Sequence, residues 1–183
     1  MKLNSYYNFL NFLNLKKFIK IKLLICDVDG VMSDGSFYIG NNEELKIFNA
    51  QDGYGIHYLL KNNIQVAIIT EKKTKLLKKR SNNLGIKHIY QGQKNKLLIY
   101  NKLLNILKIK KKEIAYIGDD LNDLSIIKKV GLSIAVANAH PMLQLNVDYI
   151  TNNHGGKGAI REVCDLILFS QGKLEKTYKI NYN

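Results

Sequence analysis

Acidic side chains follow two apolar stretches of the sequence, at the point where each stretch ends. Leu23–Cys26 leads directly into Asp27 and Asp29, and Ile114–Ile117 leads into an acidic cluster at residues 118–123. Short apolar runs of this kind are typical of buried strands in a parallel sheet. Because open α/β sheets build their sites at the carboxyl ends of their strands, we expect the two acidic groups to converge. Converging carboxylates can hold a hard divalent cation such as Mg²⁺.

Further polar residues at predicted element ends would complete a site for phosphoryl transfer. A carboxylate such as Asp27 can attack phosphorus and form an aspartyl-phosphate. An acid two residues on, Asp29, can protonate the leaving oxygen and then activate water. Thr70 can orient the phosphoryl oxygens, and Lys96 can balance their charge. The candidate metal ligands of the second cluster are Asp119 and Asp123. On its own, the Asp-x-Asp stretch also fits a solvated turn at the end of a strand.

Apolar strands alternate with helical patterns along the chain. Strands are expected at residues 23–26, 64–69, 86–90, 114–117, 132–136 and 148–151, and helices at 56–61, 72–84, 94–107, 122–129, 139–145 and 158–171. This alternation predicts an α/β fold with a doubly wound, Rossmann-like parallel sheet. Two β-prone runs around a Gly-Asn turn predict a hairpin flap at about residues 36–48. We expect residues 49–55 to form a loop in which Asp52 caps the next helix.

The predicted organisation is one domain, residues 21–172, between two terminal segments. Residues 1–20 are expected to form an extension whose helix packs on the domain or on a neighbour, and residues 173–183 an extended or mobile tail. The start of the chain lacks a signal-peptide pattern, and no stretch has the apolar length of a membrane span. Cys26 and Cys164 both lie in apolar runs, which indicates buried thiols in a reducing, cytoplasmic setting.

The sequence is strongly basic, with a formal net charge of +13. Arginine occurs only at Arg80 and Arg161, so nearly all of the positive charge comes from lysine. No nucleic-acid-binding motif accompanies this charge, and the lysine-rich segments fit solvated helix faces and helix ends. We therefore expect neither a nucleic acid nor a membrane as partner.

The polar residues above occur in the order of the four motifs of the haloacid dehalogenase-like phosphatases, which this sequence resembles. The motifs are Asp27-Val28-Asp29-Gly30-Val31, Thr70, Lys96 and Gly118-Asp119-Asp120-Leu121-Asn122-Asp123. From Ile21 to about Glu175, the sequence is more closely similar to the 3-deoxy-D-manno-octulosonate 8-phosphate phosphatase family. Segments 27–35, 48–56, 90–96, 135–141 and 155–162 carry this likeness.

The resemblance implies a Mg²⁺-dependent phosphatase that acts on an eight-carbon acidic sugar phosphate. The free sugar acid would then enter lipopolysaccharide precursor synthesis, and the enzyme would be a homotetramer. By the same resemblance, Mg²⁺ is held by the side chains of Asp27 and Asp119 and by the carbonyl of Asp29, with Asp123 acting through a bound water. The implied substrate contacts are Ser33, Lys72 and Lys157.

The sequence departs from the family pattern beside the second motif. Thr70-Glu71-Lys72 stands where the family usually has Thr-Gly-Arg, Lys157 replaces a usual Arg, and Ser33 replaces a usual Thr. Lys72 keeps the positive charge but loses the bidentate fork of arginine. Glu71 adds bulk and negative charge near an anionic substrate. We expect a weaker contact with the substrate carboxylate and intact phosphoryl chemistry.

The spacing of the motifs leaves no room for a separate cap domain. Predicted elements already fill the segments between Asp27 and Thr70 and between Thr70 and Lys96. A capless site is open to water unless a macromolecular substrate forms its own lid or neighbouring subunits close it, and the hairpin flap is a natural joining element. With the homotetramer that the resemblance implies, we hypothesise that four hairpins associate and that a neighbour's hairpin or tail completes each pocket.

Three other functions remain open from the sequence. The first is a phosphatase for another acidic sugar, such as an N-acylneuraminate 9-phosphate. The second is a non-catalytic regulatory subunit on the same fold, which Glu71 keeps open. The third is a nucleic-acid end phosphatase that uses the positive charge.

Overall fold

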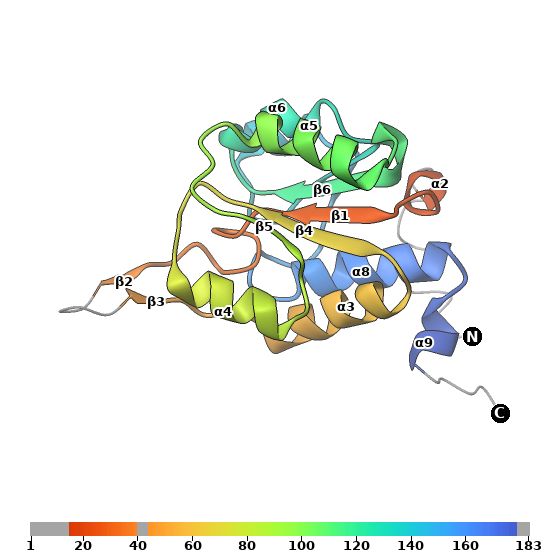
Figure 1. The fold of residues 1–183 in the computed structure, drawn as a ribbon, viewed down its shortest axis with the longest axis horizontal. Coiled ribbons are helices and arrows are strands. Elements are labelled where there is room, and N and C mark those ends of the chain that lie inside the picture. The colour runs from red at the N-terminus through yellow and green to blue at the C-terminus, as the bar shows by residue number, and fades with distance from the viewer. Residues whose placement is uncertain (1–14, 40–43, 179–183) are drawn as a thin grey trace.

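Six parallel strands form the central sheet of the computed structural model, which describes residues 15–39 and 44–178 (Figure 1). The strand order is β5-β4-β1-β6-β7-β8, and all neighbouring pairs are parallel. The strands are β1 (Leu23–Cys26), β4 (Gln65–Ile69), β5 (His88–Tyr90), β6 (Ile114–Gly118), β7 (Leu132–Ala135) and β8 (Tyr149–Ile150). The prediction of a doubly wound α/β sheet is confirmed.

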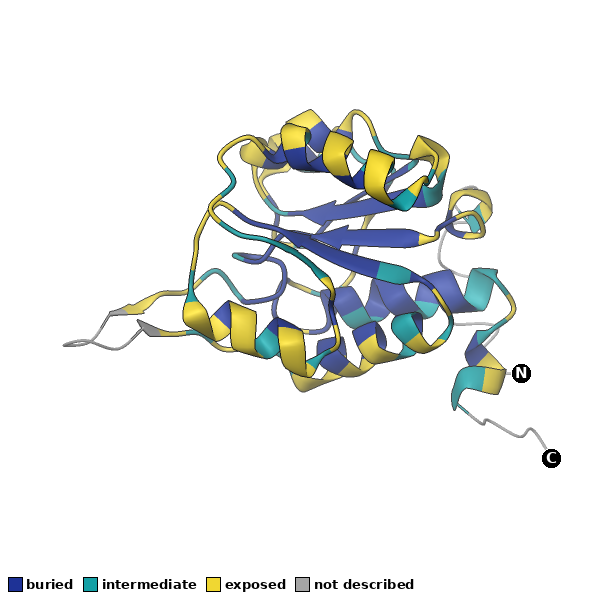
Figure 2. Cartoon of the chain, in the orientation of Figure 1, coloured by how far each residue is buried: buried dark blue, intermediate teal, exposed yellow. Residues whose placement is uncertain are grey.

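Helices cover both faces of the sheet, so its central strands β1 and β6 are buried along their whole length (Figure 2). One face carries α3 (Ala50–Lys61), α4 (Lys75–Asn83) and α8 (Ala159–Ser170), and the other carries α5 (Lys96–Leu107) and α6 (Leu124–Ile127) (Figure 1). Shorter elements are η1 (Lys111–Glu113), η2 (Leu121–Asp123) and α7 (Pro141–Gln144).

A two-stranded hairpin extends away from the sheet (Figure 1). Its strands, β2 (Tyr38–Ile39) and β3 (Glu44–Leu45), are antiparallel, with Tyr38 opposite Leu45. This hairpin lies within the predicted flap, whose tip at residues 40–43 is outside the described residues. Between residues 15 and 178, the gap at the tip aside, the chain forms no further domain over the sheet.

The start of α3 differs from the prediction. The helix begins at Ala50, and its N-cap is Asn49, whose side chain accepts hydrogen bonds from the amides of Gln51 (2.7 Å) and Asp52 (3.4 Å). The expected loop at 49–55, with Asp52 as cap, is therefore wrong. Glycines in this segment suggested a loop, but Gly55 lets α3 approach α8, where an added Cβ would lie 3.1 Å from Cys164 Cβ.

The segment after residue 172 is also more ordered than expected. Residues Leu174–Tyr178 form α9, so the prediction of an extended tail is wrong for this part. Leu174 is buried in the core, and the Tyr178 ring meets the Tyr58 ring edge to face at 4.6 Å. These tertiary contacts stabilise a helix too short to form by itself. Residues 179–183 lie outside the described residues.

A short helix, α2 (Leu15–Phe18), precedes β1 and packs on the domain, as one of the two expected arrangements had it. Phe18 is buried, and its ring contacts Tyr149 edge to face at 5.6 Å. Residues 1–14 of the predicted extension lie outside the described residues. Among the helices that the structure describes, none has the length and apolar character needed to cross a bilayer.

Candidate active site

A cavity of about 450 Å³ opens at the carboxyl ends of β1, β4 and β6. Its walls contain most of the polar residues that the sequence analysis singled out. The residues that line the cavity are Asp27, Asp29, Phe37, Thr70, Glu71, Lys72, Lys94, Lys96, Asp119, Asp120 and Asn122. The position agrees with the general rule that open α/β sheets bind ligands beyond the carboxyl ends of their strands.

Asp27 comes directly after β1 and is held by the backbone. Its amide donates a hydrogen bond to the Ile117 carbonyl (3.1 Å), which continues the pairing of β1 with β6. The chain then turns sharply, since the Val28 carbonyl accepts hydrogen bonds from the amides of Met32 (2.9 Å) and Ser33 (3.0 Å). The turn leaves Asp27 almost buried and the Asp29 side chain 23% exposed at the cavity.

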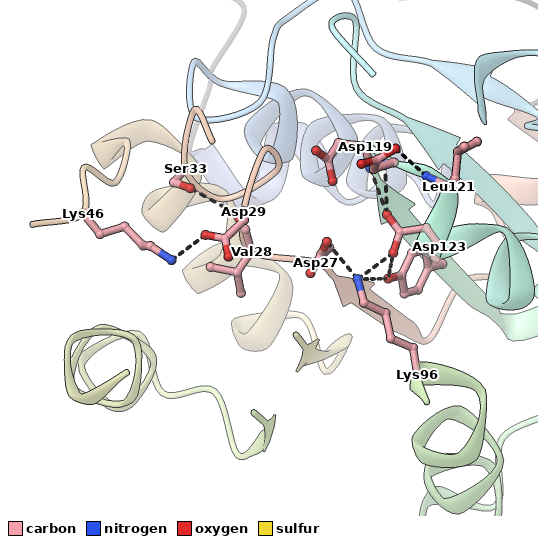
Figure 3. A network of polar contacts seen from close by, with 11 residues as sticks. Asp27, Val28, Asp29, Ser33, Lys46, Lys96, Asp119, Leu121 and Asp123 are labelled. Atoms are coloured by element: carbon pink, nitrogen blue, oxygen red, sulfur yellow. Dashed lines mark hydrogen bonds and ion pairs between the residues drawn. The ribbon is translucent and has the colours of Figure 1, made fainter. Parts of the chain in front are cut away.

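Three carboxylates converge beside this turn. One oxygen each of Asp27, Asp119 and Asp123 lies within 4.8 Å of the others (Figure 3). Burial and the neighbouring carboxylates raise the pKa of Asp27 to about 6 and that of Asp119 to about 7, although Lys96 opposes both shifts. A divalent cation would relieve this repulsion, and carboxylate oxygens are the ligands that Mg²⁺ prefers. The residues present therefore fit a magnesium site.

Glycine is required at position 30 for this convergence. Gly30 has a φ of +79°, and an added Cβ would overlap the Asp119 carboxylate. Only a residue without a side chain combines this backbone conformation with such a close approach.

Lys96 supplies a buried positive charge between the acids. Its Nζ lies 2.8 Å from Asp27 and 2.7 Å from Asp123, and its side chain is 3% exposed (Figure 3). Burial lowers the pKa of Lys96, but the two carboxylates outweigh that effect, so its pKa is raised. Lys96 is the first residue of α5, and Asn95 fixes this helix start by accepting from the Leu98 amide (3.2 Å).

Asp123 is fully buried and bonded through both carboxylate oxygens. Oδ1 accepts from Lys96 and from the Tyr116 hydroxyl (2.5 Å), and Oδ2 accepts from the amides of Asp119 (3.0 Å) and Asp120 (3.4 Å). Asp123 thereby holds the acidic loop and the lysine in one arrangement. Tyr116 was missed by the sequence analysis, because a tyrosine inside an apolar strand looks like an ordinary core residue.

Lys46 is the second residue that the sequence analysis missed. It follows β3, and its Nζ lies 2.5 Å from Asp29 Oδ1 (Figure 3). Lysines are so frequent in this sequence that nothing distinguished this one.

Of the three substrate contacts that the resemblance implies, Lys72 lines the cavity, whereas Ser33 and Lys157 lie outside its walls. Lys72 lines the cavity, with its Nζ 3.1 Å from the centroid of the Phe37 ring. The Ser33 hydroxyl is buried and donates to the Val28 carbonyl (3.3 Å), whereas Lys157 is mostly exposed, with its Nζ 3.9 Å from Asp34. Neither Ser33 nor Lys157 belongs to the cavity walls described above.

The parallel sheet and its acidic strand ends define the class of protein. Residues 81–163 match the family model for haloacid dehalogenase-like hydrolases.

More specific relatives cover most of the chain. The 3-deoxy-D-manno-octulosonate 8-phosphate phosphatase of Yersinia pestis is 56% identical over 162 residues, which are 88% of this chain and 87% of that protein. The Salmonella typhi phosphatase of the same name is 58% identical over 157 residues, covering 85% and 84% of the two chains. The chain therefore belongs to the 3-deoxy-D-manno-octulosonate 8-phosphate phosphatase family.

Solved structures agree with this assignment. The Yersinia pestis crystal structure superposes with a TM-score of 0.87 at 56% identity, covering 88% of each chain. The Moraxella catarrhalis phosphatase, in complex with magnesium ion, phosphate ion and KDO, has a TM-score of 0.89 at 40% identity, covering 91% of this chain and 98% of that one.

Proposed function

We propose that this protein is a phosphoric monoester hydrolase that converts 3-deoxy-D-manno-octulosonate 8-phosphate to the free sugar acid and phosphate. The observation that carries the proposal is the convergence of Asp27, Asp119 and Lys96 at the cavity of a chain 56% identical to a phosphatase of that name. The product is a precursor for lipopolysaccharide synthesis.

Asp27 acts as the nucleophile in this proposal. Its carboxylate attacks phosphorus and forms an aspartyl-phosphate, while Asp29 gives a proton to the departing sugar oxygen. Asp29 then takes a proton from the water that attacks the aspartyl-phosphate. Thr70 orients the phosphoryl oxygens, and Lys96 keeps the Asp27 carboxylate in place while balancing the added negative charge.

Mg²⁺ is the cofactor, and the side chains of Asp27 and Asp119 with the Asp29 carbonyl would hold it. Bound there, the ion supplies positive charge for the phosphoryl oxygens. Asp123 would act on it through a bound water, as its own oxygens accept hydrogen bonds from Lys96, Tyr116 and the acidic loop. The relief of carboxylate repulsion described above supports this assignment.

The sugar end of the substrate would meet the wall of the cavity that Glu71 and Lys72 form, where the sequence departs from the family pattern. Lys72 lies at this wall beside Glu71, and we assign it the substrate carboxylate, with Ser33 and Lys157 as further contacts once the site is closed. A single lysine beside an acid holds a carboxylate less firmly than an arginine fork would. The expected consequence is weak binding of the sugar acid rather than loss of phosphoryl transfer.

We further propose that the enzyme is a cytoplasmic homotetramer whose hairpins close neighbouring sites. Where the structure describes them, the hairpin and its base expose four large apolar side chains, Phe37 (42%), Tyr38 (50%), Leu45 (59%) and Ile47 (53%). An apolar cluster of this kind on an extended element supports burial against another subunit. The domain organisation proposed from the sequence leaves the hairpin as the joining element.

Phosphate release from purified protein with Mg²⁺ tests the function. We expect 3-deoxy-D-manno-octulosonate 8-phosphate to have a higher kcat/KM than N-acetylneuraminate 9-phosphate, with no turnover in Asp27→Asn. A preference for the nine-carbon substrate would transfer the function to the other sugar. Absence of turnover with both substrates, in a folded protein that binds Mg²⁺, would favour a regulatory subunit.

A further inference from the structure

We infer that Lys46 is a positioning residue for the proton transfer by Asp29, so that the hairpin flap takes part in the chemistry. The inference rests on the proposed function, in which Asp29 is the acid and base. It starts from an ion pair that the catalytic roles assigned above do not use.

The pair between Lys46 and Asp29 is close and shielded from water. Lys46 Nζ lies 2.5 Å from Asp29 Oδ1, and the Lys46 side chain is 2% exposed although lysine is usually a surface residue. A buried ammonium is stable only when it is paired. The Asp29 side chain is 23% exposed and lines the cavity. The ion pair therefore connects a buried lysine at the base of the hairpin to the cavity in which the substrate would react.

The base of the hairpin fixes the lysine from a second side. Lys46 Nζ lies 5.5 Å from the centroid of the Phe37 ring, a distance at which a cation is attracted to the ring face. Phe37 precedes β2 and Lys46 follows β3, so the two residues come from opposite sides of the hairpin base. The position of Lys46 therefore depends on the folded hairpin.

Asp27 and Asp29 each form an ion pair with a different lysine. Lys96 contacts Asp27 and Asp123, whereas Lys46 contacts Asp29, and Figure 3 shows the two lysines on either side of the aspartates. An unanchored carboxyl group can turn about its side-chain bonds. With Oδ1 of Asp29 held by the ammonium, Oδ2 is the oxygen that exchanges the proton.

The proton balance of the two steps shows what this orientation does. In the first step the bond from Asp27 to phosphorus forms, the bond from phosphorus to the sugar oxygen breaks, and the Asp29 proton goes to that oxygen. In the second step water attacks phosphorus, the aspartyl bond breaks, and the water proton returns to Asp29. Lys46 keeps its proton throughout, so its contribution is geometric.

Two substrates with different leaving groups test this role of Lys46. The nitrophenolate of p-nitrophenyl phosphate leaves without a proton, whereas the alkoxide of glycerol 1-phosphate needs a proton from Asp29. In Lys46→Met we expect kcat/KM for glycerol 1-phosphate to fall by about 100-fold, within the usual size of general acid catalysis. For p-nitrophenyl phosphate we expect a change of less than about threefold, since kcat/KM reports only the phosphorylation step. Lys46→Arg keeps the cation and should restore most of the alkyl phosphate activity.

Lys72→Met is the matched control. Lys72 Nζ lies 3.1 Å from the centroid of the same Phe37 ring. Among the described residues, the lysine that forms an ion pair with Asp29 is Lys46 and not Lys72. Its substitution should change kcat/KM for both small substrates by the same factor.

The outcomes separate this inference from the function on which it rests. Equal losses on both substrates in Lys46→Met, or no loss on either, would overturn the positioning role. A wild-type protein that does not hydrolyse 3-deoxy-D-manno-octulosonate 8-phosphate would refute the proposed function, and the inference with it. Circular dichroism of the three variants identifies any loss that comes from misfolding.

Discussion

At the scale of single residues, the site depends on a lysine that is almost inaccessible to water. Lys96 compensates two carboxylates that burial and mutual repulsion would otherwise destabilise. A buried ion pair adds little net stability over an apolar substitute, but removing one partner leaves an uncompensated charge. In the proposed function, Lys96 therefore contributes to both folding and catalysis.

We predict that Lys96→Met lowers the free energy of unfolding by about 3 kcal/mol in the presence of a chelator, because Asp27 and Asp123 lose their shared cation. The loss should be smaller with Mg²⁺, and kcat should fall by at least about 100-fold. Urea denaturation and phosphate release measure the two effects. The control is Lys94→Met, an exposed lysine of the same cavity, for which stability should change by less than about 0.5 kcal/mol. A Lys96→Met protein with wild-type stability and turnover would contradict this reasoning.

The candidate site residues that could be predicted from the sequence are those at the end of a strand or the start of a helix. Asp27 and Asp119 follow apolar strands, and Lys96 begins a helix, so their types and order were enough. Lys46 reaches the site through a contact between separate elements, and Tyr116 reaches Asp123, seven residues further on, only because the chain turns after β6. No local pattern encodes either contact. Their roles became visible only with the folded chain.

At the scale of elements, the turn after β1 is braced by the loop that leads into α8. An added Cβ at Gly155 would overlap the Gly30 carbonyl, and one at Gly156 would overlap the backbone of Ser33 and Asp34. The glycines before α8 thus allow two backbone segments to pack directly on each other, which fixes the loop carrying Asp27.

We predict that Gly156→Ala destabilises the protein by at least about 3 kcal/mol, because both backbone strain and overlap with residues 33–34 oppose the new methyl group. Gly172→Ala is a matched control, since its φ of +65° nearly equals the +66° of Gly156 but none of the described residues lies within 4 Å of its added Cβ. It should cost only about 1–2 kcal/mol. Equal destabilisation of the two variants in urea denaturation would show that the close packing is unimportant.

Asp52 joins α3 to α8 by a contact that depends on pH. Its Oδ1 accepts from the Arg161 amide (2.8 Å) at the start of α8, and within the described residues its buried Oδ2 has no hydrogen-bond partner. Burial raises the pKa of Asp52 from 3.8 to about 6, against the opposing effect of the α8 amides. Between these two values the folded protein holds a proton that the unfolded chain has released.

The contribution of Asp52 to stability is therefore fully present below pH 3.8 and is lost as the pH rises through about 6. We predict that wild type loses on the order of 2 kcal/mol more unfolding free energy than Asp52→Asn between pH 4.5 and 7.5, because asparagine resembles the protonated acid at every pH. Urea denaturation at both pH values gives the difference. Parallel pH profiles for the two proteins would rule out this role for Asp52.

At the scale of the whole molecule, the sheet and its covering helices could be predicted because alternating apolar strands and helices leave few other arrangements. The start of α3 and the helix α9 could not. Their residues look like loop or tail in isolation, and contacts with α8, Tyr58 and the core determine their structure. Local patterns give the framework, whereas tertiary contacts set its ends.

Assembly is the second property at this scale. We predict a tetramer by light scattering, with dissociation in Leu45→Glu, because a charge in the buried apolar cluster of the hairpins would be unpaired. Dissociation should lower turnover of the sugar phosphate more than turnover of p-nitrophenyl phosphate. Leu98→Glu changes an equally exposed leucine (62%) on α5 and should leave the mass unchanged. A wild-type monomer at working concentration would refute the assembly.

The central claim, that Asp27 takes the phosphoryl group while Asp29 moves the protons, is tested most directly in the Asp29→Asn variant. With p-nitrophenyl phosphate and Mg²⁺, this variant should release a burst of about one nitrophenolate per chain and then nearly stop, since no base remains to activate water. Mass spectrometry of the quenched protein should find the phosphate on Asp27. Phosphate on another residue, or steady turnover with no burst and no phosphorylated chain, would contradict the account.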